Sequence, residues 1–258
     1  MLDLYKFSHF ENTPNLLHAV TTKSEKLPYA FSLALHTGED KEIIVKNRTL
    51  LASIFKQNKT LHYVVANQTH SDNIKTIVTT QTKGWNDLED AIAECDALIT
   101  NIPSVVLTIL TADCVPLLLH DKKKQVVAVV HAGWRGTKAK IVSKTVNKMN
   151  KEYACHPSNI LVGIAPSIGA CCYEVAYDVA EHFMHIPKGC TAKADKYMLD
   201  LPYINKQQLL DIGIKEENIE MSNLCTACKV ARFFSYRKEK GCSGRFMSMI
   251  ALKDKHAN

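Results

Sequence analysis

Two side chains capable of nucleophilic or metal-binding chemistry, those of Cys114 and His131, lie at the ends of neighbouring apolar runs. The runs 115–119 (VPLLL) and 126–130 (VVAVV) flank the polar stretch HDKKKQ, which predicts an antiparallel hairpin. If a four-residue loop at 121–124 closes this hairpin, the numbers of opposed residues add to 245, and Cys114 lies opposite His131. Opposed residues share a face of the sheet, with Cβ atoms about 4.5–5.5 Å apart. The thiol and the imidazole are therefore expected to meet, unless a slip of one residue sends them to opposite faces.

A cysteine beside a histidine supports two chemistries. The histidine can be the base for a thiol nucleophile, or both side chains can be ligands of a soft metal; a packed pair without chemistry is the third interpretation. His70, in the polar loop NQTHSDN after the strand-like run HYVVA, supplies another candidate ligand. His70, Cys114 and His131 together suit zinc with a fourth position left open, and the same set can hold copper. Ligand type does not choose between these metals.

These residues require strands and loops that end at one place. Apolar runs alternate with helical patterns along the chain, which predicts a single α/β or α+β domain. A helix over 138–153 is expected after GWRGT, with Thr137 as its N-cap, while Arg135 either holds an anion or caps the turn. Another helix over 40–56 carries Arg48 on its apolar stripe. An arginine that faces inward needs a partner, or else lies at the edge of the core.

The nine cysteines form an odd set, which in a reducing compartment favours thiols, ligands or nucleophiles over disulfides. Cys225 and Cys228, in CTAC, suggest a zinc ribbon with Cys242 downstream, but the sequence has no second CxxC pair. The adjacent Cys171 and Cys172 are expected to be core or loop residues. The spacing alone assigns no chemistry to these cysteines.

Composition and charge limit the class of protein. The chain has 258 residues, of which 46% are hydrophobic and 22% charged, as in ordinary globular domains. It shows no secretory signal and no run of about 18 apolar residues, so we expect a cytoplasmic protein that does not enter a membrane. The formal charge of +6 is modest and scattered, and neither GxGxxG nor GxxxxGK[ST] occurs. We therefore expect no nucleic-acid partner, and a monomer is the default expectation.

Several longer motifs resemble those of a known family. They are NQTHS, CDALIT, LTADCVPLLLHD, VVHAGWRGT, GIAPSIGACCYEV, LDL and FFSYRKEKGCSGR, in this order from about residue 30 to the C-terminus. The chain resembles the YfiH-like, or laccase-domain, family. The resemblance implies one domain over 1–258 with a layered α/β/β/α sandwich, similar to the catalytic domain of the cytotoxic necrotizing factor toxins.

The resemblance also implies roles for individual residues. The metal and catalytic site of the family falls on His70, Cys114 and His131, and its arginine for phosphate or substrate falls on Arg48, which follows Asn47. The segment FSLALHTGED departs from the family pattern, because serine 32 and alanine 34 stand where asparagine and glycine are usual. The contacts that the family makes near residues 32–34 are therefore not carried over to this sequence.

The resemblance implies two kinds of activity. Members are described as purine nucleoside phosphorylases acting on adenosine, inosine, guanosine and methylthioadenosine, with adenosine deaminase activity, and as multicopper polyphenol oxidases. A multicopper centre typically uses H-x-H pairs, and the eleven histidines here form none. We therefore expect a zinc-dependent phosphorylase and deaminase, with Asp113 as the nearest carboxylate for proton transfer. The alternatives are a copper-dependent laccase-like oxidase and a metal-free cysteine hydrolase that uses Cys114 and His131.

Overall fold

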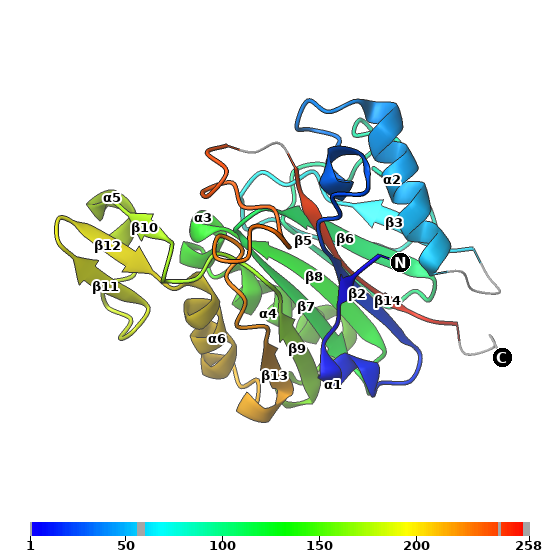
Figure 1. Ribbon diagram of the computed structural model, residues 1–258. Helices are drawn as coiled ribbons and strands as arrows, with labels where there is room; N and C mark the ends of the chain where they lie inside the picture. The colour runs from blue at the N-terminus through cyan, green and yellow to red at the C-terminus, as the bar shows by residue number, and fades with distance from the viewer. Residues whose placement is uncertain (1, 56–59, 242–243, 255–258) are drawn as a thin grey trace.

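Two β-sheets form the centre of the computed structural model, which describes residues 2–55, 60–241 and 244–254 (Figure 1). The five-stranded sheet has the order β1 (Leu4–Tyr5), β2 (Leu16–Thr21), β14 (Phe246–Leu252), β6 (Val105–Thr111) and β3 (His62–Val65). The six-stranded sheet has the order β13 (Ile219–Met221), β9 (Ile160–Ile164), β7 (Val115–Asp121), β8 (Val126–Ala132), β5 (Ala97–Thr100) and β4 (Ile74–Thr76). A three-stranded sheet of β10 (Glu174–Val175), β12 (Lys196–Leu199) and β11 (Cys190–Lys193) projects to one side.

Helices cover the outer faces of the two large sheets. The α-helices are α1 (Ser8–Glu11), α2 (Lys41–Ile54), α3 (Trp134–Lys138), α4 (Ile141–Tyr153), α5 (Tyr177–Ala180) and α6 (Leu201–Asp211). Short 3-10 helices are η1 (Pro28–Phe31), η2 (Pro157–Asn159) and η3 (Glu216–Asn218). Helix α2 packs on the five-stranded sheet, whereas α4 and α6 pack on the six-stranded sheet (Figure 1). The predicted α/β/β/α layering is confirmed.

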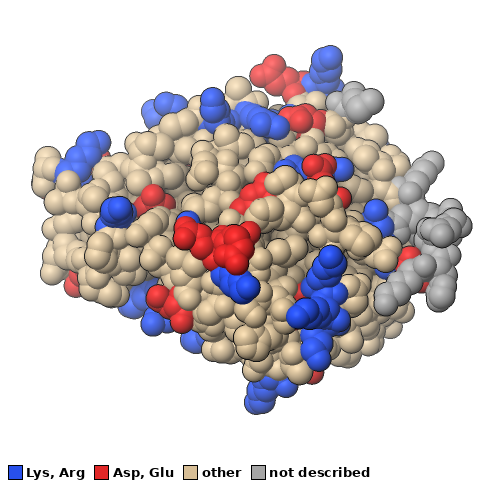
Figure 2. All heavy atoms as spheres, turned by 90° about the horizontal axis from the view of Figure 1, so that it is seen from below, with Lys and Arg blue, Asp and Glu red and all other residues tan. Residues whose placement is uncertain are grey.

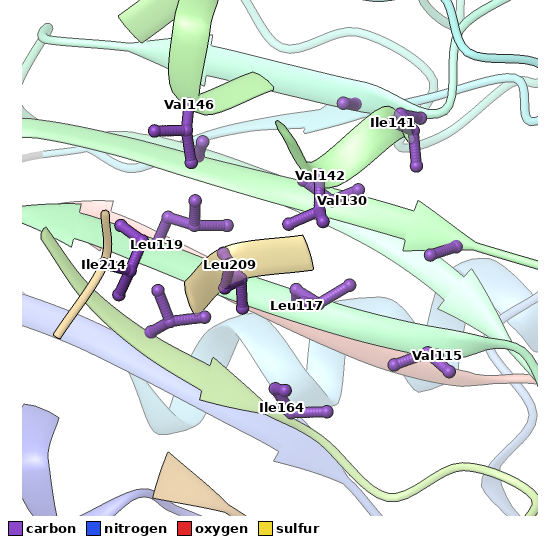
Figure 3. Close-up of a cluster of buried hydrophobic side chains, with 14 of the residues drawn as sticks. Val115, Leu117, Leu119, Val130, Ile141, Val142, Val146, Ile164, Leu209 and Ile214 are labelled. Atoms are coloured by element: carbon purple, nitrogen blue, oxygen red, sulfur yellow. The ribbon is translucent and has the colours of Figure 1, made fainter. Parts of the chain in front are cut away.

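Period-two alternation along apolar strands explains these layers. In β7, Leu117 and Leu119 face α4 and α6, whereas Leu118 faces the other sheet. Figure 3 shows the first of these layers, where α4 contributes Val142 and Val146. Each such side chain contributes roughly 1.5–3 kcal/mol when fully buried, so a strand that is apolar on both faces is held firmly between two layers.

The predicted hairpin forms, but its register differs from the one expected. Strands β7 and β8 pair with opposed numbers that add to 247, so His131 lies opposite Pro116. The side chain of Asp121 accepts hydrogen bonds from the backbone N–H groups of Lys123 and Lys124, at 2.9 and 3.0 Å. These bonds keep Asp121 in the strand and move the loop on by one residue. Because the sum changes by two, every side chain keeps its face, and Cys114 and His131 remain diagonal neighbours.

The predicted helix after GWRGT begins later than expected. A separate short helix, α3, forms first, and α4 starts after Lys140, whose backbone is left-handed with φ 58°. Thr137 is therefore inside α3 and is not the N-cap of α4. Its hydroxyl accepts a hydrogen bond from Asn205 and its carbonyl accepts one from Gln208, at 3.0 and 2.8 Å. The threonine thus joins α3 to α6.

Charges of both signs are interspersed on the face shown in Figure 2, so the formal charge of +6 does not gather there into one basic surface. In the described part of the chain, every helix is too short or too polar to span a bilayer.

Candidate functional site

The structure brings His70, Cys114 and His131 together from three separate segments. His70 lies in the loop after β3, Cys114 directly precedes β7, and His131 lies near the end of β8. Their candidate ligand atoms lie within 4.8 Å of one another. The Sγ of Cys114 is 3.8 Å from Nε2 of His70, and the two imidazole rings meet edge to face with centroids 4.8 Å apart. His131 is buried, Cys114 is half-buried and His70 is exposed, so the cluster opens on one side.

Gly133 makes this close approach sterically possible. A Cβ atom at this position would lie 3.0 Å from Cδ2 of His70 and 3.2 Å from Sγ of Cys114. These distances are shorter than ordinary van der Waals contacts, so a side chain would push the two residues away. The glycine after HA in VVHAGWRGT therefore contributes to the site because its lack of a side chain leaves space for His70 and Cys114.

Asp96 holds two parts of the site in position. Its carboxylate is fully buried and lies 2.7 Å from Nδ1 of His131, which leaves Nε2 directed toward the cluster. The same carboxylate accepts hydrogen bonds from the backbone N–H groups of Thr69, His70 and Ser71, and from the Ser71 hydroxyl, at 2.7–3.2 Å. One side chain thus orients His131 and holds the loop that carries His70.

The electrostatics of the site favour a thiolate. Burial alone would raise the pKa of Cys114, but the neighbouring His131 and His70 lower this pKa to about 6. Burial alone would lower the pKa of His131, but the Cys114 thiolate and Asp96 raise this pKa to about 9. Between these values the pair is a thiolate and an imidazolium. Only one proton must leave, that on His131, for both side chains to become metal ligands.

This donor set fits a soft divalent metal ion. One thiolate and two imidazoles are ligands that zinc and copper share. The carboxylate that fixes the His131 tautomer is the usual outer support of a metal-binding histidine. All three candidate ligands also line a cavity, which leaves room for a further ligand or a substrate on the open side.

The cavity has a volume of about 530 Å³, within the range of small-molecule sites. Its wall includes cationic and aromatic side chains, namely His36, Arg48, Tyr173, Tyr236, Arg237 and Arg245. Such a wall suits an anionic group together with a flat ring. Arg135 is not among the lining residues; its guanidinium is exposed and lies 4.3 Å from the ring centre of Trp134.

Arg48 faces inward, as the helix pattern predicted. Its side chain is 1% exposed and donates hydrogen bonds to the carbonyl oxygens of Leu33, Gly84 and Trp85, at 2.6–2.9 Å. Burial lowers its pKa to about 10. The adjacent Asn47 donates to the carbonyl oxygens of residues 28 and 32. Both residues therefore fasten α2 to the loops around the cavity, and Arg48 also forms part of the cavity wall.

The comparisons with known proteins agree with this architecture. The family model described as multi-copper polyphenol oxidoreductase laccase matches residues 18–253. The chain belongs to the YfiH-like laccase-domain family. Purine nucleoside phosphorylase YlmD from Bacillus subtilis is 33% identical to this laccase-domain protein over 255 residues, covering 95% of this chain and 91% of that protein. A purine nucleoside phosphorylase from Bacteroides thetaiotaomicron is 34% identical over 249 residues, covering 92% of each.

A solved structure extends the match to three dimensions. The crystal structure of YlmD from Geobacillus stearothermophilus aligns with a TM-score of 0.89 at 31% identity, covering 96% of this chain and 94% of that chain. The expected family and fold are therefore confirmed for this laccase-domain protein.

Two aspartates near the site, Asp96 and Asp113, hold loops in place through their carboxylates. Asp96 has no predicted role in the sequence beyond its place in the motif CDALIT, although a carboxylate directly before a buried strand can indicate a supporting role. Asp113, the carboxylate expected nearest to Cys114, has a left-handed backbone with φ 92°. Its carboxylate accepts hydrogen bonds from the Thr226 hydroxyl at 2.6 Å and the Arg237 backbone N–H at 2.7 Å. Asp113 thus ties the loop of Cys114 to the C-terminal loop of this laccase-domain protein.

Segment 32–34, where the sequence departs from the family pattern, lies beside Arg245 of the cavity wall and does not itself line the cavity. The Ser32 hydroxyl accepts a hydrogen bond from the Arg245 backbone N–H at 3.3 Å, and Ala34 is fully buried. The serine therefore connects this segment to the residue that precedes β14.

Proposed function

We propose that this chain, acting as one domain over 1–258, is a zinc-dependent purine nucleoside phosphorylase that also deaminates adenosine. His70, Cys114 and His131 are the proposed zinc ligands and catalytic residues. The observation that carries the proposal is their convergence at one cavity, with Asp96 orienting His131. Relatives named purine nucleoside phosphorylase over nearly the whole chain support the substrate class. We further propose a monomeric, cytoplasmic enzyme without a nucleic-acid partner.

Phosphorolysis sets requirements that the cavity wall can meet. The bond between the ribose C1′ and the purine nitrogen breaks, and a phosphate oxygen forms a new bond to C1′. A phosphate dianion must therefore be held beside the sugar, and Arg48, Arg237 and Arg245 line the cavity. Tyr173 and Tyr236 offer aromatic faces for the flat base. Four of the five N–H donors of Arg48 are bonded to backbone carbonyl oxygens, so we assign to the phosphate or substrate side of the cavity only its positive charge and its remaining N–H donor.

Deamination makes a different demand. It replaces the amino group at C6 of adenine with oxygen from water, and ammonia leaves. Zinc held at the site would supply a Lewis acid that makes water a stronger nucleophile at neutral pH. Asp96 keeps the His131 imidazole in position, and Gly133 leaves the space that His70 and Cys114 need.

Two other activities remain as candidates. The pKa of about 6 for Cys114 favours a thiolate nucleophile, which supports a metal-free cysteine hydrolase. The family description names copper oxidases, but the candidate ligand clusters among residues 2–55, 60–241 and 244–254 hold two histidines in total. That number fits one metal ion better than a multicopper centre. A hydrolase is inactivated by alkylation of Cys114 and is indifferent to chelators; an oxidase consumes oxygen with phenols.

The deciding experiment incubates zinc-loaded protein with adenosine, with and without phosphate. We expect adenine and ribose 1-phosphate only when phosphate is present, and inosine in both cases. Cys114→Ala and His131→Ala should abolish all three products, whereas Cys190→Ala, a half-buried cysteine in β11, should not. Failure of the zinc-loaded protein to form any of the three products would refute the proposal.

A further inference from the structure

A second cluster of metal-ligating side chains lies outside the site described above. The sequence has no second CxxC pair to accompany Cys225 and Cys228, and it predicts that Cys171 and Cys172 are core or loop residues. Cys242, the downstream cysteine of the zinc-ribbon interpretation, lies outside the described residues. The structure brings these four cysteines together, with their sulfur atoms within 4.8 Å of one another. Two cysteines more than 50 positions earlier in the sequence thus supply the second pair of candidate ligands that the CTAC motif lacks.

The sulfur positions match those required around one metal ion. Sγ of Cys228 is 3.5 Å from Sγ of Cys171 and 3.4 Å from Sγ of Cys172. Zinc bound by four thiolates at about 2.3 Å, at the corners of a tetrahedron, places its sulfur atoms about 3.8 Å apart. Separations of this size leave room for a single ion, because a cluster of several irons would hold its cysteines farther apart.

A tight turn lets the adjacent cysteines face the same way. The backbone N–H groups of Cys172 and Tyr173 both donate to the carbonyl oxygen of Gly169, at 3.0 Å each. The N–H of Gly169 itself donates to Sγ of Cys225 at 3.3 Å, a bond that favours the anionic form of the sulfur. A Cβ atom on Gly169 would lie 3.6 Å from Sγ of Cys171, an ordinary van der Waals distance, so the turn lies directly against the cluster.

We propose that Cys171, Cys172, Cys225 and Cys228 form a second metal site, a closed tetrathiolate site for one zinc ion. Four protein ligands leave no open position, so the site is structural. Binding requires loss of the thiol protons and no change in oxidation state. The proposal does not rest on the function proposed for the cavity above, because none of its four ligands is a residue assigned there.

The location of the cluster indicates which part of the structure a bound ion would stabilise. The two loops that carry the cysteines are also joined through Ser167, which bonds to Leu224 and Thr226 of the second loop. Thr226 in turn bonds to Asp113, beside Cys114. The first loop leads directly into Tyr173 of the cavity wall. A metal ion that fixes both loops therefore holds this side of the cavity in place without touching a substrate.

Zinc content per chain tests the proposal. Each protein is purified under reducing conditions, saturated with zinc, desalted and measured by mass spectrometry of the metal. We expect about two zinc ions in the wild type and in the control Cys190→Ser. The double variant Cys225→Ser/Cys228→Ser should lose one ion. The double variant His70→Ala/Cys114→Ala, which removes ligands of the first site, should retain one ion. Unchanged zinc in Cys225→Ser/Cys228→Ser would overturn the proposal.

A spectroscopic measurement keeps the proposal falsifiable if Cys225→Ser/Cys228→Ser does not fold. Zinc X-ray absorption of His70→Ala/Cys114→Ala should show four sulfur ligands at about 2.3 Å and no nitrogen ligand. A nitrogen-rich environment, or the absence of zinc from this folded variant, would refute the proposal. A disulfide between any two of these four cysteines, located by peptide mapping of the zinc-treated wild type, would also overturn it.

Discussion

Replacing Asp96 with asparagine tests how the site is supported. Oδ1 of Asp96 accepts hydrogen bonds from the His70 backbone and the His131 ring, and Oδ2 accepts from Thr69 and from two groups of Ser71. An asparagine of the same shape has one oxygen, so its NH₂ group must face at least two of these donors. Loss of two hydrogen bonds to a charged acceptor, at about 1.5–3 kcal/mol each, predicts a decrease of about 3–6 kcal/mol in the free energy of unfolding.

The same change should weaken metal binding. Removal of the group that orients a metal-binding histidine typically costs 10- to 100-fold in affinity, or about 1.4–2.8 kcal/mol. Zinc affinity is measured by competition with a chromophoric chelator, and stability by guanidinium unfolding of the metal-free protein. The matched control is Asp72→Asn, because Asp72 lies in the same loop but pairs with Lys144 at the surface. A folded Asp96→Asn protein whose zinc affinity lies within about twofold of the wild type would refute the supporting role.

Three further predictions concern neighbouring residues. In metal-free protein, the rate at which iodoacetamide alkylates Cys114 should be half-maximal near pH 6. The lowered pKa of Cys114 leaves the thiolate present above that pH and removes it below. A midpoint near the ordinary cysteine pKa of about 8.5 would contradict this. Arg48→Met leaves three carbonyl oxygens without their donor, so unfolding measurements should show a loss of about 3 kcal/mol or more, and a loss below about 1 kcal/mol contradicts the structural role. Gly133→Ala should lower zinc affinity at least about tenfold with little change in circular dichroism, because its Cβ would displace His70 and Cys114; unchanged affinity contradicts the steric argument.

The hairpin illustrates what the sequence could predict. Two short apolar runs around a polar stretch were sufficient to predict β7, β8 and the approach of Cys114 to His131. The exact register was wrong, because the side chain of Asp121 bonds to the loop backbone and extends the strand by one residue. The predicted approach of Cys114 to His131 was nevertheless correct, because a change of two in the pairing sum preserves the face of each residue.

Other parts of the site depend on contacts that no local pattern reveals. Asp96 reaches His131 only because β5 and β8 are neighbours in the six-stranded sheet. Cys171 and Cys172 meet Cys225 and Cys228 only because two distant loops pack together. Periodicity predicts which face of a strand is buried, but it does not predict which loops meet beyond the strand ends.

The most direct test of the proposed function is the return of activity when zinc is added to metal-free protein. The measured quantity is ribose 1-phosphate formed from adenosine and phosphate. We predict that the metal-free wild type is inactive, that zinc restores the reaction, and that His131→Ala stays inactive with zinc although it remains folded. Full phosphorolysis by the metal-free protein, or by zinc-treated His131→Ala, would contradict a zinc site at His70, Cys114 and His131.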